Sequence, residues 1–225
     1  MNSYSDWIKT LHKTYGSLTK ESKLSTKQVT PKEIDEVFLP KPKFDYTEFV
    51  LTSETPIEIL KNYELYGKVG ILSYAHYTDP AVDWKVGDYS QEALLCSCST
   101  LYPCLEQYEE FYEEHRAYPN NDLFTSDCLF VDKCFFTEEE DSKFLNKEAS
   151  VLSMSAPTLT PDNEEFFELT LLMRVRDVLK VFAKYGCETL IIGDYKLKSS
   201  RIMEHWRTVL DTHDGVFKTV YIIQN

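Results

Sequence analysis

The chain has 225 residues, of which 43% are hydrophobic and 14% aromatic, so it can bury a sizeable core as one domain with an extension. Its net charge of -13 argues against nucleic acid as a partner, because nucleic-acid-binding surfaces concentrate Lys and Arg. It has no apolar run near the roughly 18 to 20 residues of a membrane helix and no signal peptide, so we expect an intracellular protein, cytoplasmic or nuclear, without membrane contact.

The charge is unevenly placed along the chain. Residues 1–43 hold eight lysines against five acids, which leaves 16 basic and 32 acidic residues for the remainder. An anionic ligand on this acidic body would need a helix N-terminus or a nest of backbone N–H groups to hold it.

The six cysteines stand mostly among apolar neighbours, as in CLFVDKCFF, which indicates reduced, buried thiols. Cys96, Cys98 and Cys104 with a histidine could in principle bind zinc. Their C-x-C-x5-C spacing lacks the paired pattern of structural zinc sites, so we expect no metal. We also expect no cofactor.

The first 45 residues are predicted to form a helical extension and linker. Tyr4, Trp7 and Leu11 share one face of a helix that Gly16 would stop. The Ser- and Lys-rich stretch SLTKESKLSTKQVT, residues 17–30, is typical of a flexible linker or a long ordered loop. Thr30, followed by Pro31 and Glu33, indicates a capped short helix, and LPKPKF after it must be extended.

Residues 46–225 are predicted to form the body, in which strands alternate with helices. A helix is expected from Thr55 to Gly67, another over 89–114 with a break near Pro103, a long one capped by Asp162, and one around Trp206. The predicted strands are 48–53, 68–75, 128–136, 148–156, 188–195 and 216–224. This pattern predicts an α/β fold, a three-layer α/β/α sandwich with a mixed central sheet.

Two strand exits are candidates for a ligand site, because ligands of such folds gather at the carboxyl ends of the central strands. The first exit runs from Ile71 to Ala93, and the second is IIGDYKLKSSRI, residues 191–202. The lysines and serines of the second exit could hold a phosphate.

The first exit resembles the signature of the bacterial-type poly(ADP-ribose) glycohydrolases, a branch of the macro domains. That family reads approximately L-N-F-A-S-A-K-N-P-G-G-G, then Q-E-E-S-L-C-R-S-S-T-L-Y. This chain has LSYAHYTDPAVD at 72–83 and QEALLCSCSTLY at 91–102, without a gap. The resemblance continues through FYEEHRAY, VLSMSAPTL and LIIGDY to about residue 223, and it implies a macro-domain-like fold that binds ADP-ribose.

The departures from the family fall on its functional residues. The triple glycine that lets backbone N–H groups approach the diphosphate corresponds to Ala81, Val82 and Asp83, which add side chains and one charge. The second glutamate of Q-E-E, which the resemblance makes the general acid, corresponds to Ala93. Of the family's glycine-rich phosphate loop, only Gly193 remains.

The candidate site therefore has no assigned catalytic residue, with Glu92 and Asp83 as weak candidates for the missing acid. The candidate ligand-binding residues are Asp79, Ala81, Val82, Asp83, Gln91, Glu92, Gly193, Lys196, Lys198, Ser199 and Ser200. Ordinary roles compete with these assignments: Glu92 also suits a helix first turn, and lysines before a helix are usually solvated. His76 and Asp79 could form an acid/base pair or merely a surface pair.

Three functions remain open. We favour a catalytically degenerate macro-domain protein, a pseudoenzyme that acts as a binding or interaction module with residual affinity for ADP-ribose or a related nucleotide. The alternatives are an active ADP-ribosyl hydrolase with relocated acids, and a scaffold in a larger assembly without a small-molecule ligand. A protein partner would bind through the N-terminal extension or through the acidic, aromatic segment EQYEEFYEEH, residues 106–115.

Overall fold

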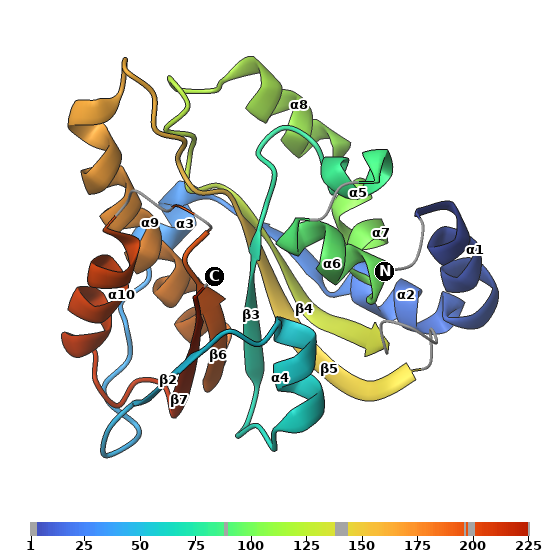
Figure 1. Cartoon of the computed structure of the whole chain (residues 1–225), viewed down its shortest axis with the longest axis horizontal. Coiled ribbons are helices and arrows are strands. Elements are labelled where there is room, and N and C mark those ends of the chain that lie inside the picture. The colour runs from blue at the N-terminus through green and yellow to red at the C-terminus, as the bar shows by residue number, and fades with distance from the viewer. Residues whose placement is uncertain (1–3, 88–89, 138–143, 196, 198–200, 225) are drawn as a thin grey trace.

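A mixed β-sheet forms the centre of the computed structural model, which describes residues 4–87, 90–137, 144–195, 197 and 201–224 (Figure 1). In this part of the chain the sheet has seven strands in the order β1-β4-β5-β3-β6-β7-β2. The strands are β1 (Thr26–Val29), β2 (Glu48–Thr52), β3 (Val69–Tyr74), β4 (Cys128–Thr137), β5 (Phe144–Met154), β6 (Thr189–Gly193) and β7 (Thr219–Ile223). The two pairs that involve β4 are antiparallel, and the other four pairs are parallel.

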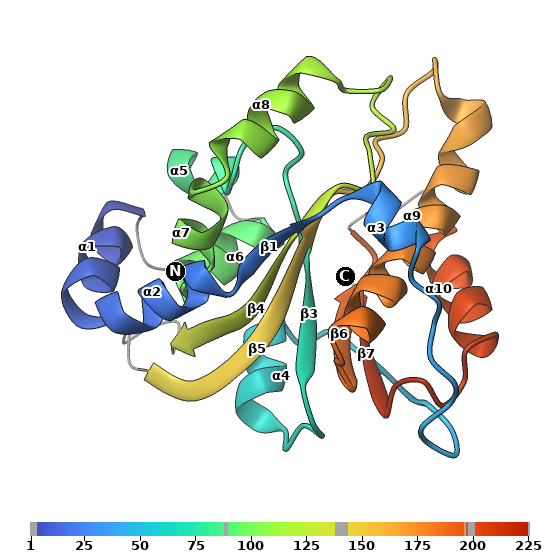
Figure 2. The ribbon, with the colours of Figure 1, turned by 180° about the vertical axis from the view of Figure 1, so that it is seen from behind.

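Helices cover both faces of the sheet, and each face has its own apolar core (Figures 1 and 2). The central strand β3 is buried on both faces, since Ile71 belongs to one core and Leu72 to the other. The first core is covered by α1 (Tyr4–Thr14), α2 (Gly16–Leu24), α4 (Pro56–Asn62), α5 (Val82–Val86), α6 (Gln91–Ser97), α7 (Leu101–Glu106) and α8 (Glu109–Ala117). The second is covered by α3 (Pro31–Asp35), α9 (Glu164–Lys184) and α10 (Ile202–Asp211). The predicted three-layer α/β sandwich with a mixed sheet is confirmed.

The predicted linker is instead regular structure. Residues 17–24 continue the helix α2, which begins at Gly16, and β1 pairs antiparallel with β4 at the edge of the sheet. Gly16 therefore does not end the helical region. The linker prediction was wrong because the pairing partner of β1 lies about a hundred residues further along, beyond any local pattern. The division of the chain at residue 45 stays a prediction.

The apolar face of α1 packs against the body. Trp7 is 1% exposed, and its Nε1 donates a hydrogen bond to the carbonyl oxygen of Ser99 at 3.1 Å. Tyr4 makes edge-to-face contacts with Trp84 and Tyr102. These aromatic side chains of the extension therefore pack against the body of the same chain.

The predicted cap of α3 is confirmed, and α4 begins with a capping box of the same kind. In α4 the Thr55 hydroxyl accepts from the backbone N–H of Glu58, whose carboxylate accepts from the backbone N–H of Thr55 at 2.7 Å. Thr30 and Glu33 do the same for α3. Each box satisfies backbone donors that a helix start leaves unpaired.

Replacing Thr55 with Ala is expected to lower the free energy of unfolding by about 1 kcal/mol, because the helix loses its N-cap acceptor. Urea denaturation measures the change. Thr10→Ala is the matched control, since Thr10 lies within α1 and its hydroxyl only donates back to the carbonyl of Asp6; it is expected to be neutral. Equal losses in the two variants would contradict the assigned role of the cap.

Three predicted helix boundaries need correction. The helix after Thr55 ends at Asn62 rather than at Gly67. The segment 89–114 contains three helices, and its first break lies at residues 98–100, because Pro103 occupies the first turn of α7, where no backbone donor is needed. The N-cap of α9 is Asn163, not Asp162.

The six cysteines are free and buried, as predicted. Burial raises the pKa of the Cys96 and Cys104 thiols. Among the described residues no three His, Cys, Asp or Glu side chains gather in a way that could hold a metal ion. In the same part of the chain no helix is long and apolar enough to cross a membrane.

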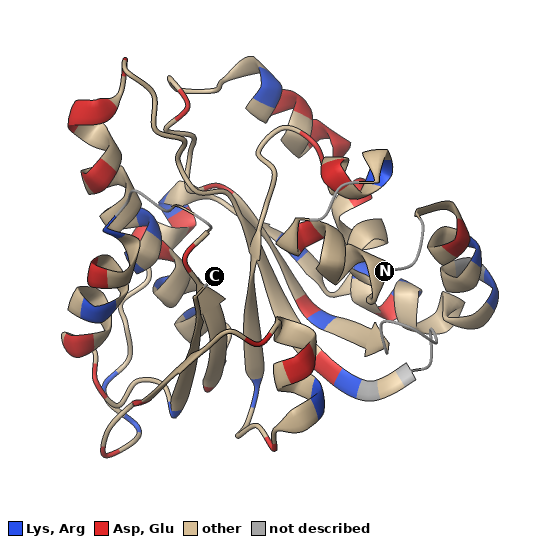
Figure 3. Ribbon diagram, in the orientation of Figure 1, with Lys and Arg blue, Asp and Glu red and all other residues tan. Residues whose placement is uncertain are grey.

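The segment 106–115 does not present an aromatic face. Phe111, Tyr112 and His115 are buried in α8, while the glutamates at 109, 110, 113 and 114 are exposed. In Figure 3 acidic residues colour much of the α8 ribbon red. The exposed side of α8 is therefore acidic, and its aromatic rings belong to the core.

Candidate ligand site at the carboxyl edge of the sheet

Two loops meet at the carboxyl ends of the central strands. The loop of residues 75–81 follows β3, and the segment that begins at Asp194 follows β6. Because β3 and β6 are neighbouring parallel strands, their exits lie side by side at one edge of the sheet. The two predicted strand exits are thus brought together.

Gln91 fixes the end of β3. Its side-chain amide donates to the carbonyl oxygen of Leu72 at 2.8 Å, and its amide oxygen accepts from the backbone N–H of Tyr74 at 2.9 Å. Both polar ends of this side chain are therefore engaged with the strand. Gln91 therefore positions α6 against β3.

The buried side chain of Glu92 forms hydrogen bonds with the backbone of the first loop. The side chain is 2% exposed, and Oε2 accepts from the backbone N–H groups of His76 at 3.3 Å and Ala81 at 3.2 Å. Oε1 is buried and has no hydrogen-bond partner among the described residues. The carboxyl group therefore connects the two ends of the loop through hydrogen bonds. Its other oxygen, Oε1, forms none with the described residues.

The surroundings of Glu92 favour its protonated form. Burial, the largest effect, raises its pKa to about 8; the two backbone hydrogen bonds oppose the rise, and Asp83 adds to it. A carboxyl group in this state carries a proton at neutral pH, which is the form a general acid requires.

Ala93 lies in the core. It is fully buried among the apolar residues beneath α6, and its backbone N–H donates to the Ser90 hydroxyl at 3.1 Å, the N-cap contact of this helix. A cavity of about 320 Å³ opens beside Tyr77, His115 and Asp127, and Ala93 does not line it. Ala93, which the resemblance places at the position of the general acid, therefore has only a methyl group there, and this group packs against other buried atoms.

The residues at the family's glycine positions adopt different environments. Ala81 is fully buried and has a φ of 49°, the left-handed region that favours glycine. Val82 and Asp83 form the first turn of α5 and are half-buried. The backbone thus keeps a glycine-like turn at Ala81 although a side chain is present.

Asp79 is held by Arg116, a contact that the sequence did not indicate. The guanidinium Nη1 of Arg116 lies 3.4 Å from Oδ1 of Asp79, and the Thr78 hydroxyl donates to Oδ2 at 2.9 Å. The His76 ring contacts Thr78 instead. An acid/base pair of His76 and Asp79 is therefore not among the contacts of the described residues.

At the start of the second exit, the Tyr74 side chain covers Gly193. Gly193 accepts a hydrogen bond from Trp206 Nε1 through its carbonyl oxygen at 2.9 Å, and the Tyr74 hydroxyl lies over its Cα, where a Cβ would collide with it. Gly193 is needed for this close approach. The predicted phosphate ligands Lys196, Lys198, Ser199 and Ser200 lie outside the described residues.

Sequence reasoning missed Tyr74 as a residue of this candidate site. Its signal was available, because the family run has phenylalanine at the position of Tyr74 and the tyrosine adds a hydroxyl group. The hydroxyl lies over Gly193, and the ring packs against that of Tyr195 with centroids 5.0 Å apart. The side chain thus links the two loops.

The seven-stranded mixed sheet, with two loops over its carboxyl edge, defines a macro-domain-like protein of the poly(ADP-ribose) glycohydrolase (PARG) type. A family model for the catalytic domain of microbial-type PARG matches residues 10–138, more than half of the chain, so the chain belongs to this family.

Solved structures of bacterial PARGs share the fold. PARG from Thermomonospora curvata bound to the inhibitor ADP-HPD superposes with a TM-score of 0.84 at 17% identity, over 97% of this chain and 90% of that chain. PARG from Deinococcus radiodurans in complex with ADP-ribose gives a TM-score of 0.77 at 20% identity, over 91% of this chain and 89% of that chain. No curated protein matches the sequence.

Proposed function

We propose that this chain is a non-hydrolysing member of the PARG family that acts as a binding or interaction module, with residual affinity for ADP-ribose or a related nucleotide. One observation carries the proposal: the position of the family's general acid is Ala93, fully buried in the core. An alanine has no proton to donate, and loss of a positioned general acid typically costs about 10²- to 10⁴-fold in rate.

The loop next to Ala93 supports weaker ligand binding. The added side chains of Ala81, Val82 and Asp83 stand where the resemblance has glycines, and Asp83 brings a negative charge beside a ligand that is itself anionic. The solved Deinococcus relative is in complex with ADP-ribose, which makes ADP-ribose the first ligand to test.

The proposal predicts that the purified chain releases no ADP-ribose from poly(ADP-ribose)-modified protein above about 1% of the rate of the Thermomonospora enzyme. Release is measured by chromatography of the free nucleotide, with that enzyme as the positive control. Calorimetric titration with ADP-ribose separately measures binding. Turnover at a rate comparable to the control would contradict the proposal.

A second candidate function is hydrolysis with Glu92 as the acid. It is favoured by the pKa of Glu92, which burial raises to about 8, and by the unpartnered Oε1. Any turnover found should then disappear in Glu92→Gln, which keeps the shape of the side chain without an acidic proton.

The scaffold alternative predicts no response to ADP-ribose at all. The acidic outer side of α8 is the surface we propose for a protein partner with basic residues, since exposed glutamates attract opposite charge.

A further inference from the structure

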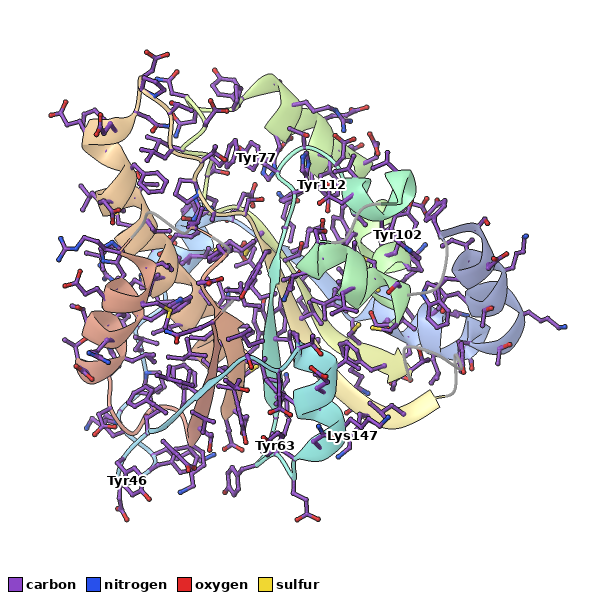
Figure 4. The ribbon with its side chains drawn as sticks, in the orientation of Figure 1. Tyr46, Tyr63, Tyr77, Tyr102, Tyr112 and Lys147 are labelled. Carbon is purple, nitrogen blue, oxygen red and sulfur yellow. The ribbon has the colours of Figure 1, made fainter. Side chains whose placement is uncertain are left out.

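A cavity of about 320 Å³ lies at the C-terminal end of α8, next to the segment that leads into β4. Tyr77 of the first loop lines it from the upper part of the molecule, where its side chain lies near α8 (Figure 4). Neither Glu92 nor Gly193 lines this cavity, which makes it a separate candidate site. Its walls also include Glu114, His115, Tyr118, Thr125 and Asp127.

Two buried atoms of these walls, Nε2 of His115 and Oδ1 of Asp127, have no hydrogen-bond partner among the described residues. His115 is 4% exposed, and its Nδ1 lies 3.0 Å from the carbonyl oxygen of Tyr77. A carbonyl oxygen can only accept, so Nδ1 carries the hydrogen and Nε2 of the neutral ring is an acceptor. Nε2 is 3.9 Å from Oδ2 of Asp127, too far for a direct hydrogen bond. Both side chains can therefore accept from a donor that enters the cavity.

Neighbouring side chains hold the two acceptors in place. The Tyr77 ring stacks between the rings of His115 and Phe124, with centroids 4.0 Å and 4.1 Å apart. The side-chain amide of Gln28 donates to Oδ2 of Asp127 at 3.2 Å, which leaves Oδ1 for another donor. A site whose groups are fixed before binding loses less conformational entropy when a ligand arrives.

The charge and the aromatic surface of the cavity favour a cation. Asp127 and Glu114 bring carboxyl groups to it, and the glutamates at 109, 110 and 113 are exposed on the same helix as Glu114. Tyr118 is 77% exposed, so its ring can pack against a cation. A guanidinium group carries five N–H donors in one plane, can donate to two acceptors at once and stacks on aromatic rings. An anionic ligand would be repelled by the carboxylates.

We propose that this cavity binds the guanidinium group of an arginine side chain from a protein partner. The N–H groups of the arginine donate to Nε2 of His115 and Oδ1 of Asp127, and Tyr118 packs against the cation. The inference rests on the interaction role within the proposed function, because it specifies how a basic partner attracted by the acidic side of α8 is anchored.

The test is an NMR titration of the full chain with N-acetyl-arginine amide, which reproduces an arginine residue within a peptide. The control probe is N-acetyl-citrulline amide, which has a similar shape but a neutral urea group. Backbone amide signals of the lining residues Ala117, Tyr118 and Asp127 report binding. The arginine probe is expected to shift them saturably and to bind at least about 10-fold more tightly than the citrulline probe, because its hydrogen bonds are charge-assisted. A blocked peptide with the arginine between lysines should bind more tightly still, because the exposed glutamates attract the lysines.

Asp127→Asn is expected to weaken binding of the arginine probe at least about 10-fold, because the anionic acceptor becomes a neutral amide. Glu110→Gln is the matched control: it removes the same charge from the exposed side of α8, outside the cavity, and should stay within about 2-fold of the wild type. Equal losses in these two variants would contradict the proposed site. Thermal unfolding verifies that each variant is folded.

Tyr118→Ala provides a second variant that leaves the core intact, since the side chain is mostly exposed. It is expected to weaken binding of the arginine probe about 3-fold through loss of the contact between ring and cation. Tyr46→Ala is its control, because Tyr46 is 59% exposed and lies at the opposite end of the molecule from Tyr77 (Figure 4). An unchanged affinity in Tyr118→Ala would remove Tyr118 from the site.

The absence of a saturable shift with the arginine probe, or equal affinities for the arginine and citrulline probes, would overturn the inference. A peptide that binds no more tightly than the single residue would also overturn it, since the ligand would then not be a basic protein segment. Turnover of ADP-ribosylated protein by the wild type would remove the proposed function but leave the arginine titration unchanged, so the two failures can be told apart.

Discussion

Ala93→Glu is expected to destabilise the fold by about 3 to 5 kcal/mol instead of restoring hydrolysis. Ala93 is fully buried against the apolar core beneath α6, so a carboxylate there would be an unpaired buried charge. The buried carboxyl of Glu92 on the preceding residue would add repulsion or force one of the two to hold a proton. Urea denaturation at pH 7 measures the loss.

Val86→Glu is the matched control for this variant. Val86 is 75% exposed on α5, so the same new carboxylate stays in water and is expected to change the free energy of unfolding by less than about 0.5 kcal/mol. If Ala93→Glu were as stable as the wild type and released ADP-ribose from modified protein, the catalytic position would be open and the proposed packing around it incorrect.

Glu92 is expected to make the fold less stable as the pH rises from about 4.5 to 8. Its pKa is 4.5 in an ordinary environment and about 8 in the folded chain, mainly through burial. Between these values the folded state keeps a proton that the unfolded state has lost. The contribution of Glu92 to the free energy of unfolding is therefore greatest below pH 4.5 and declines up to about pH 8. One pKa unit corresponds to about 1.4 kcal/mol, which makes the whole decline a few kcal/mol.

Glu92→Gln removes this titration and retains an oxygen that can accept from His76 and Ala81. It should therefore match the wild type near pH 4.5 and exceed it by a few kcal/mol at pH 8 in urea denaturation. Glu33→Gln is the control of opposite sign: hydrogen bonds from the backbone and hydroxyl of Thr30 lower the pKa of Glu33, so this substitution should only reduce stability at neutral pH. Parallel pH profiles for the wild type and Glu92→Gln would show that Glu92 is not a buried acid.

The elements that the sequence predicted correctly are those determined by nearby residues. Thr30 with Glu33 and Thr55 with Glu58 each carry their cap within one turn. The strand β1 was missed because its buried residues, Thr26 and Val29, show no apolar alternation, and only the pairing with β4 makes the segment a strand.

Part of the candidate site could likewise be predicted from the sequence, and part of it could not. The family resemblance located Ala93, Glu92 and Gly193, because that comparison needs only their order in the chain. It could not show that Glu92 turns inward onto the loop or that the Tyr74 hydroxyl covers Gly193, since both depend on contacts between separate elements. The role of Arg116 beside Asp79 depends on the packing of α8 over the loop and has no local pattern.

The left-handed turn at Ala81 bears on how other divergent members of the family can be recognised. The main chain there follows a course that suits glycine, and the alanine carries strain of about 1 kcal/mol to follow it. Glycine would follow the same main-chain path at this turn without that strain. For sequences in which this glycine is replaced, the torsion angle at the turn is therefore a structural feature to compare in addition to the sequence motif.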